Sequence, residues 1–341
     1  MIRVLVVDDS ALMRNILVDI LSADSRLEVV DTAANAHQAR AAIKRLNPDV
    51  MTLDVEMPGM DGLSFLSNLM RLRPMPVVMV STFTARGAAT TLKALELGAY
   101  DVVEKPTVHS SDALSQYAEE LTHKVYEASL ANVEALRPAR ANAVGVTNAH
   151  ENRARRPEVV AVGASTGGTE ALRYLVSCLP ADAPALIVAQ HIPPQFSASF
   201  AERLDASSAM VVREARADDV IQAGHVYIAP GDHHLTVVGG EGQFTCQLDT
   251  GVKVNRHRPS VDVLFESVSE HVGARAIGIL LTGMGSDGAR GMCALRAGGA
   301  KTIAQDEATS VVWGMPRAAI RSGGAEAVMA LPNIATYLCG F

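Results

Sequence analysis

The chain has 341 residues, and its 30 Lys and Arg against 37 Asp and Glu give a formal net charge of −7 at pH 7. This length exceeds what one hydrophobic core usually serves, so two domains are expected. The acidic balance offers no electrostatic footprint for nucleic acid, and no nucleic-acid partner is expected. Apolar runs are too short to span a bilayer, and the N-terminus loses its apolar character too early for a signal peptide. The protein is therefore expected to be cytoplasmic and not inserted in a membrane.

The four cysteines lie far apart and form no C-x-x-C pair; they are Cys178, Cys246, Cys293 and Cys339. This spacing argues against a zinc site and against a disulfide framework. A reducing compartment fits the cysteine usage best.

The first part of the chain alternates apolar strands with helical stretches. A strand is predicted at residues 2–7, and Ser10 can cap the helix that follows. Further strands are predicted at residues 27–32, 50–53, 77–80 and 100–103. This alternation predicts an α/β fold with a doubly wound parallel sheet.

Charged and polar residues follow the strands of this predicted sheet. Asp8 and Asp9 follow the first strand and Asp54 follows the third, so three carboxylates are expected at one sheet edge. Like charges at close range disfavour joint ionisation, and Mg²⁺ is the usual cation for carboxylates that also handle a phosphoryl group. Lys105, after the fifth strand, could neutralise a phosphoryl oxygen, and the Ser81 hydroxyl could bond to another.

Residues 1–130 resemble a two-component receiver domain with a (βα)5 fold. The resemblance is carried by VVDDS at residues 6–10, LDVEMPGMDG at 53–62, VS at 80–81 and EKP at 104–106. It implies that Asp54 accepts a phosphoryl group from a partner histidine kinase. It also implies that Asp8, Asp9, Asp54 and the main-chain carbonyl of Glu56 help to bind Mg²⁺.

The same resemblance implies that Ser81 and Lys105 respond to the phosphorylated state. Val102 stands three residues before the lysine, where the family often has an aromatic side chain. The usual aromatic rotamer switch is therefore in doubt for this chain.

Residues 131–157 are predicted as a linker, because helical periodicity is lost and Pro, Gly and Asn are scattered through the segment. The segment carries a basic cluster of Arg153, Arg155 and Arg156. A solvated connector is the favoured interpretation, and a contact with an acidic partner is the alternative.

The sequence GASTGG at residues 163–168 follows a short apolar run at 159–162. The run is typical of a buried parallel strand, so Ser165 is expected at a strand's carboxyl end, where open α/β sheets bind ligands. The pattern fits the G-x-S-x-G turn that exposes a serine nucleophile. It also loosely fits a glycine-rich phosphate-binding loop, and glycines used only for close packing are a third interpretation.

Two later strand ends favour the nucleophile. The predicted strand at 185–189 ends in Gln190 and His191, where a dinucleotide-binding fold would have an acidic residue for the ribose. His191 is instead placed to act as a general base for Ser165. Asp287 follows the predicted strand at 276–281 and can orient the imidazole. These residues predict a Ser-His-Asp triad whose chain order differs from that of α/β-hydrolases.

Residues 158–341 resemble the catalytic domain of the chemotaxis protein-glutamate methylesterases, with a doubly wound, mainly parallel α/β fold. The resemblance is carried by GASTGG at 163–168, QH at 190–191, HRPSVD at 257–262, LTGMGSDGA at 281–289 and GMPRAA at 314–319. It implies hydrolysis of γ-glutamyl methyl esters on cytoplasmic helices of chemoreceptors, and deamidation of certain receptor glutamines. It places Ser165, His191 and Asp287 in the triad, and no cofactor is expected for the esterase reaction.

Four further residues near these motifs have less defined roles. The backbone N–H groups of Thr166 and Met284 are candidates for an oxyanion hole, since glycine-flanked turns let the main chain approach closely. His257 and Arg258 could bind an acidic receptor surface or could hold a loop before the helix predicted at 260–271.

The resemblance also implies that the receiver covers the catalytic face until phosphorylation loosens it. Two other classes of protein are alternatives: a receiver joined to a DNA-binding domain, and a receiver joined to a nucleotide-binding oxidoreductase. The acidic charge and the lack of a recognisable helix-turn-helix argue against the first. The Gln190-His191 strand ending argues against the second.

Overall fold

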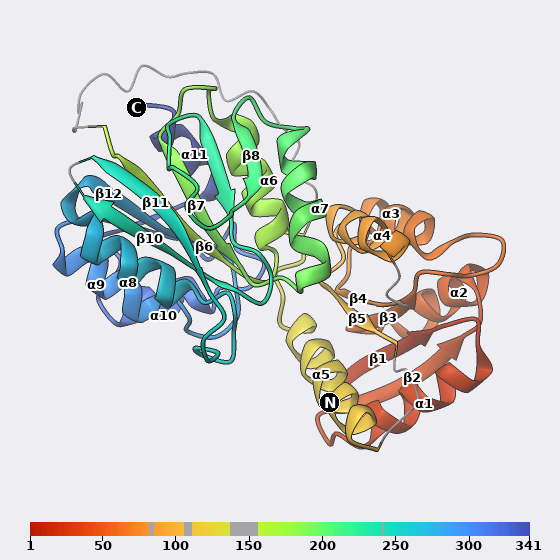
Figure 1. The fold of residues 1–341 in the computed structure, drawn as a ribbon. Helices are drawn as coiled ribbons and strands as arrows, with labels where there is room; N and C mark the ends of the chain where they lie inside the picture. Colours follow the sequence, from red (N-terminus) through yellow and green to blue (C-terminus); the bar gives the residue numbers. More distant parts are fainter. Residues whose placement is uncertain (82–84, 106–110, 137–155, 241) are drawn as a thin grey trace. The chain divides into compact units, whose positions relative to one another are not determined.

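The computed structural model describes residues 1–81, 85–105, 111–136, 156–240 and 242–341, and the chain divides into two compact units, Met1–Pro138 and Ala139–Phe341. Figure 1 labels the helices and strands of both units.

The first unit contains a five-stranded parallel sheet in the order β2-β1-β3-β4-β5. Its elements are β1 (Ile2–Val7), α1 (Ala11–Ser22), β2 (Leu27–Ala33), α2 (Ala36–Leu46), β3 (Val50–Asp54), α3 (Gly62–Leu72), β4 (Val77–Ser81), α4 (Ala85–Glu96), β5 (Asp101–Glu104) and α5 (Ser111–Ala128). Helices α1 and α5 pack together on one face of the sheet, and α3 packs against α4 on the other (Figure 1). The predicted (βα)5 fold is confirmed.

The second unit is organised around a seven-stranded, entirely parallel sheet in the order β14-β13-β12-β6-β7-β9-β8. Its elements are β6 (Val159–Ala164), α6 (Gly168–Cys178), β7 (Ala185–Gln190), α7 (Pro194–Asp205), β8 (Val211–Glu214), β9 (His225–Ile228), β10 (His234–Gly240), β11 (Gln243–Asp249), α8 (Val261–His271), the 3₁₀ turn Gly273–Arg275, β12 (Ala276–Leu280), α9 (Ala289–Ala297), β13 (Lys301–Gln305), α10 (Met315–Arg321), β14 (Ala327–Met329) and α11 (Leu331–Leu338). The predicted doubly wound α/β fold is confirmed.

Helices cover both faces of this second sheet. Helices α8, α9 and α10 lie on one face, and α6, α7 and α11 lie on the other (Figure 1). The antiparallel hairpin of β10 and β11 is separate from the main sheet and packs against α8. The loop at residues 250–260 connects this hairpin to α8, and it contributes residues to the active site.

The central strands are apolar because both of their faces are covered. Every residue of β3, β4, β6, β7 and β12 is buried. This explains why these strands appear in the sequence as continuous apolar runs without alternation. Strands β13 and β14 were not predicted from the sequence, since β13 begins with a lysine and β14 has only three residues.

The first helix begins where the sequence predicts. The Ser10 side chain accepts a hydrogen bond from the Met13 N–H at 3.3 Å, so Ser10 is the N-cap of α1. This bond satisfies one of the donors that a helix N-terminus leaves free. Ser10 directly follows Asp9, and its N–H donates to Asp8 Oδ1 at 2.9 Å, so the capping residue also fixes the turn on which these carboxylates lie.

Most of the predicted linker at residues 131–157 falls outside the described residues, including Arg153 and Arg155. Residues 131–136 form turns after α5, and Leu136 is buried in the first unit. Arg156, which is described, donates a hydrogen bond to the main-chain oxygen of Asp182. No helix in the described parts of the chain has both the length and the apolarity to cross a membrane.

Candidate active site and phosphoryl-acceptor site

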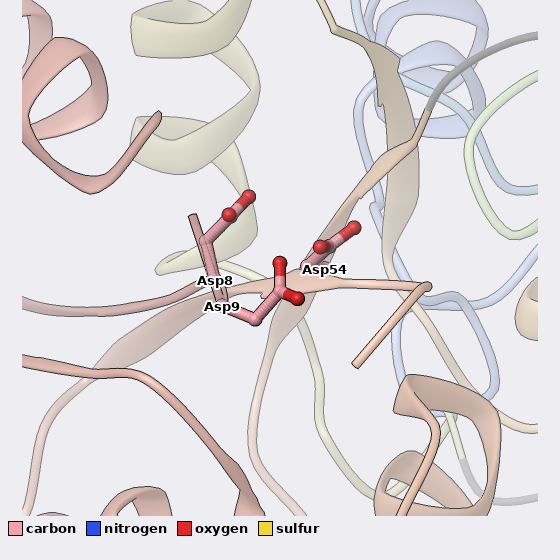
Figure 2. Close-up of side chains that lie close together, drawn as sticks. All are labelled: Asp8, Asp9 and Asp54. Atoms are coloured by element: carbon pink, nitrogen blue, oxygen red, sulfur yellow. The ribbon is translucent and has the colours of Figure 1, made fainter. Parts of the chain in front are cut away.

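The acidic residues predicted at the first sheet edge do meet. Asp8 and Asp9 directly follow β1, and Asp54 is the last residue of the neighbouring strand β3. One oxygen of each carboxylate lies within 4.8 Å of the others (Figure 2). Asp8 and Asp54 are buried and Asp9 is exposed, so the cluster opens to solvent on the Asp9 side.

Lys105 neutralises part of this acidic cluster. Its Nζ lies 3.0 Å from Asp8 Oδ2 and 2.9 Å from Asp54 Oδ2. Burial opposes the charge on Lys105, but the bonds to Asp54 and Asp8 outweigh it and raise the pKa of the ammonium group. Burial also raises the pKa of Asp54, against the effect of Lys105. One cation facing three carboxylates leaves excess negative charge, and hard carboxylate oxygens at this spacing fit Mg²⁺.

Two other predicted receiver residues lie at the same edge. Ser81 ends β4 and is buried, and its main-chain oxygen accepts a hydrogen bond from the Lys105 N–H at 2.8 Å. The Glu56 N–H donates to Asp54 Oδ1 at 3.2 Å, which turns the loop after β3 back over the carboxylate. Val102 is buried within β5. This chain therefore has a small, buried valine at the position where receiver domains often have an aromatic side chain.

In the second unit, Ser165 lies in the turn between β6 and α6. Its N–H donates to the Thr282 main-chain oxygen at 3.0 Å, and its own main-chain oxygen accepts from the Gly168 N–H at 2.7 Å. The turn needs glycine at two positions. Gly167 has φ +74°, and a Cβ on Gly168 would lie 2.2 Å from Gln190 Oε1. The glycines thus allow close packing around a turn in which Ser165 is partly buried.

His191 connects the other two predicted triad residues. It follows β7, the strand that pairs with β6, and its N–H donates to the Ala164 main-chain oxygen at 3.1 Å. Its Nδ1 lies 3.1 Å from Ser165 Oγ, and its Nε2 lies 2.8 Å from Asp287 Oδ2. A carboxylate only accepts hydrogen bonds, so Nε2 carries the proton and Nδ1 is left to accept from the serine hydroxyl. The ring is therefore reversed relative to serine proteases, in which Nε2 faces the serine and Nδ1 binds the aspartate.

Asp287 is buried and receives five hydrogen bonds. Besides His191, its donors are Asn255 Nδ2 at 2.7 Å, Ser260 Oγ at 2.8 Å, Val261 N–H at 2.7 Å and Asp262 N–H at 3.2 Å. The two N–H groups belong to the first turn of α8, whose dipole favours an anion there. Burial opposes ionisation, but these bonds, led by that of His191, outweigh it and hold the pKa of Asp287 below its ordinary value. Asp287 is thus fixed as a carboxylate.

Two positioning contacts were not predicted from the sequence. Gln190 is buried at the end of β7, and its Nε2 donates to the main-chain oxygens of both Ser165 at 2.9 Å and His191 at 3.0 Å. Asn255 Nδ2 bridges Asp287 and Asp262 Oδ2, the latter at 2.8 Å. The sequence does not predict these contacts, because the amide of a buried glutamine or asparagine can donate to any nearby carbonyl or carboxylate oxygen.

The predicted oxyanion donors lie on the loops that flank Ser165. Among the described residues, no hydrogen bond is made by the backbone N–H of Thr166 or of Met284. A Cβ on Gly283, next to Met284, would lie 2.8 Å from the Ser165 Cβ, so the two loops are in close contact. Free N–H groups beside the serine are what an oxyanion hole requires.

His257 and Arg258 differ in their surroundings. The Arg258 guanidinium bonds to Asp232 Oδ1 at 2.7 Å and to the main-chain oxygen of Gly251 at 2.6 Å, so it holds the loop at residues 250–260. The His257 ring lies against His191 instead, with ring centroids 3.6 Å apart and planes inclined by 11°. Burial, followed by the neighbouring charge of His191, lowers the pKa of His257 to about 4.

This lowered pKa predicts a pH dependence of stability. Between pH 6.5 and 4 the unfolded chain protonates His257 and the folded chain does not, so the second unit should lose stability as the pH falls through this window. After discounting for solvent around the ring, we expect a loss of up to about 2 kcal/mol that His257→Phe removes. Trp313, the single tryptophan, lies in this unit, so its fluorescence during urea unfolding at pH 7 and pH 4.5 measures the effect. An equal pH dependence in both proteins would contradict it.

Comparisons with known proteins identify the families to which the two parts of the chain are similar. Residues 160–338 match the family described as CheB methylesterase, and residues 4–118 match the response regulator receiver domain. A protein-glutamate methylesterase/protein-glutamine glutaminase 2 of Xanthomonas oryzae pv. oryzae is 53% identical over 346 residues, which cover 99% of this chain and 96% of the relative. A relative of the same name from Saccharophagus degradans is 52% identical over 339 residues, covering 99% and 97%.

A solved structure supports the fold of the second unit. The crystal structure of the Thermotoga maritima CheB methylesterase catalytic domain is 37% identical, with a TM-score of 0.53, and it covers 54% of this chain and 98% of its own. These matches leave neither the DNA-binding nor the nucleotide-binding alternative with support. The chain belongs to the family of protein-glutamate methylesterase/protein-glutamine glutaminases that carry an N-terminal receiver domain.

Proposed function

We propose that this protein hydrolyses γ-glutamyl methyl esters, and deamidates certain glutamines, on the cytoplasmic helices of chemoreceptors during chemotactic adaptation. The observation that carries the proposal is the continuous hydrogen-bond chain from Ser165 Oγ through His191 to Asp287, at 3.1 and 2.8 Å. It supplies a nucleophile, a base with the correct tautomer and a fixed carboxylate in one site.

The proposed reaction begins when Ser165 Oγ attacks the ester carbonyl carbon and His191 Nδ1 takes the hydroxyl proton. The backbone N–H groups of Thr166 and Met284 hydrogen-bond to the oxyanion of the tetrahedral intermediate. The carbon–methoxy bond then breaks, and His191 returns the proton to the leaving oxygen, so methanol departs and an acyl-enzyme remains. Asp287 stabilises the imidazolium in both steps through Nε2.

Water completes the reaction by the reverse sequence. His191 Nδ1 takes a proton from water, the resulting oxygen attacks the acyl carbon, and the proton passes to Ser165 Oγ as its bond to carbon breaks. The product is the γ-carboxylic acid of glutamate, which releases its proton to solvent and becomes a carboxylate. With a glutamine substrate the leaving group is ammonia, which takes the proton that methanol takes in the ester reaction, so both activities use the same residues.

The test of this function is methanol release from methylated receptor by the full chain. We expect release to be catalytic in enzyme and to be accompanied by new glutamate carboxylates on the receptor. A receptor preparation that keeps all of its methyl esters in the presence of folded enzyme and a phosphodonor would contradict the proposal.

We further propose that Asp54 is phosphorylated by a partner histidine kinase and that this controls the esterase. Mg²⁺, held by Asp8, Asp9, Asp54 and the main-chain carbonyl of Glu56, would neutralise charge on the transferred phosphoryl oxygens. Support comes from the grouping of the three carboxylates within 4.8 Å. Lys105 and Ser81 would contact the phosphoryl oxygens, and Lys105 would exchange its bond to the Asp54 carboxylate for one to the phosphoryl group.

The regulatory proposal predicts the behaviour of Asp54→Asn. The wild-type rate of methanol release should rise when a small phosphodonor and Mg²⁺ are added, by a factor within the ~5–150-fold range of typical coupling. Asp54→Asn should keep the basal rate and lose the rise, because an amide cannot accept the phosphoryl group. Asp19→Asn, an exposed position on α1, is the matched control and should respond as wild type does. A phosphodonor response that survives in Asp54→Asn would exclude this residue as the acceptor.

A further inference from the structure

One feature of the active site is not used by the proposed triad chemistry: His257 lies face to face with the general base. The His191 and His257 rings are nearly parallel, at 3.6 Å between centroids and 11° between planes. His191 is held at its edges by Ser165 Oγ and Asp287 Oδ2, which are bonds in the plane of the ring. In-plane bonds leave the ring free to tilt, and a second ring against its face opposes that motion.

The backbone that carries His257 is a tight, doubly bonded turn. The Val254 N–H donates to the His257 oxygen at 3.1 Å, and the His257 N–H donates to the Val254 oxygen at 2.9 Å. Between them, Asn255 and Arg256 have φ of +51° and +70°. Positive φ at both central residues is the pattern of type I′ turns, and it is unfavourable for arginine. Such strain persists only where the surrounding structure fixes it.

Contacts with surrounding residues hold this turn in its strained conformation, and one of these residues belongs to the triad. Asn255 Nδ2 bonds to Asp287 Oδ1 at 2.7 Å. On the other side, the Ser260 N–H donates to the buried His234 Nδ1 at 3.2 Å, and His234 Nε2 donates to the Val252 oxygen at 3.0 Å. Arg258 ties the same loop to Asp232. The turn therefore holds the triad carboxylate with one residue and the face of the triad imidazole with another.

We propose that His257 is a positioning residue for His191: its ring stacks on the imidazole and keeps Nδ1 aimed at Ser165 and Nε2 at Asp287. The inference rests on the proposed esterase function for its kinetic consequence, but the positioning itself is a property of the resting enzyme. His257 is suited to this task because it stays neutral beside a ring that becomes cationic during the reaction. The charged or titratable groups that act on it are His191, Asp287, Lys253 and Arg256, and its pKa of about 4 keeps it neutral near pH 7.

The test compares His257→Ala, which removes the ring, with His257→Phe, which keeps a planar ring but has no ring nitrogen. Full-length protein labelled with ¹⁵N-histidine reports the His191 Nε2–H bonded to Asp287 as a downfield proton resonance. We expect this resonance in the wild type and in His257→Phe, and we expect it to broaden or vanish in His257→Ala. This measurement needs no substrate, so it remains informative if the proposed esterase activity fails.

The kinetic arm uses methanol release. We expect His257→Ala to lower kcat by about tenfold or more with KM changed less than about twofold, since loss of orientation affects the chemical step. His257→Phe should recover most of kcat. His225→Ala, at the start of β9 and therefore at the opposite end of the strands from Ser165 and His191, is the control and should behave as wild type does.

Four outcomes would overturn the inference. A wild-type resonance and kcat in His257→Ala would show that the stacked ring is dispensable. Equal loss of kcat in His257→Phe and His257→Ala, with both proteins folded, would assign the role to a ring nitrogen. A rise in KM alone would make His257 a substrate contact. If His257→Ala does not fold, loss of the resonance in folded His257→Phe is the result that contradicts stacking.

Discussion

Replacing Ser165 by alanine is expected to abolish methanol release, with a fall in kcat of at least about a thousandfold. The serine hydroxyl is the proposed nucleophile, and its Oγ has His191 Nδ1 as its hydrogen-bond partner at 3.1 Å. Removing it leaves no atom to form the acyl-enzyme. The residual rate would come from binding and from the backbone N–H groups of Thr166 and Met284, which the substitution does not touch.

This substitution should leave the fold intact, because the turn at Ser165 is held by main-chain bonds to Thr282 and Gly168. Urea unfolding and the His191 Nε2–H resonance check that expectation. Ser177→Ala is the matched control, since Ser177 lies on α6 with its hydroxyl bonded to the Tyr174 oxygen. Methanol release at the wild-type rate by Ser165→Ala would exclude the covalent mechanism.

Replacing Asp287 by asparagine should lower kcat by roughly 10³–10⁴-fold, for a different reason. If the amide nitrogen takes the place of Oδ2, it donates toward His191 Nε2. The imidazole then carries its proton on Nδ1 and cannot accept the proton of Ser165. The pH–rate profile should no longer show a rise in rate that comes from deprotonation of His191 as the base. The downfield Nε2–H resonance should also disappear.

The same change should also destabilise the second unit. Both oxygens of Asp287 accept hydrogen bonds, Oδ2 from Val261 N–H and Oδ1 from Asp262 N–H and Ser260 Oγ. An amide nitrogen on either side meets a donor, which costs about 1–3 kcal/mol for each buried group left unpaired. Trp313 fluorescence during urea unfolding measures this loss, and Asp182→Asn, at an exposed position, is the control. A rate within tenfold of wild type would mean that Asp287 does not set the tautomer of His191.

The sequence predicted the receiver fold well because β1, β3 and β4 are short apolar runs, and β1, β3, β4 and β5 each end at or next to a polar residue of the predicted site. Parallel strands bring these ends to one edge, so Asp8, Asp9 and Asp54 could be grouped from their positions alone. The sequence did not determine that Lys105 bridges Asp8 and Asp54. A lysine side chain has several rotamers, and only the packed sheet edge selects the one that reaches both carboxylates.

The sequence also predicted that Ser165, His191 and Asp287 meet, since each follows a central strand. What it could not supply was their orientation. Which imidazole nitrogen faces the serine depends on where the neighbouring loops place Asp287, and that is decided by the donors at the start of α8. In the sequence, Gln190 stands where a dinucleotide-binding fold would have an acid, which indicates no role for its amide. Its bonds to the main-chain oxygens of Ser165 and His191 form only when β6 and β7 pair.

His257 is a residue whose role the sequence left open and the tertiary structure decided. Its sequence position, before a proline and a predicted helix, was compatible with a surface contact or with a loop support. The tertiary structure alone brings it onto the face of His191, because the turn at residues 254–257 is anchored to Asp287 and to His234, which are distant in sequence. Local patterns thus determined which residues carry the chemistry, through strand ends and periodicity. The orientation of each side chain was decided by contacts between segments that are far apart in the chain. No local sequence pattern encodes such contacts.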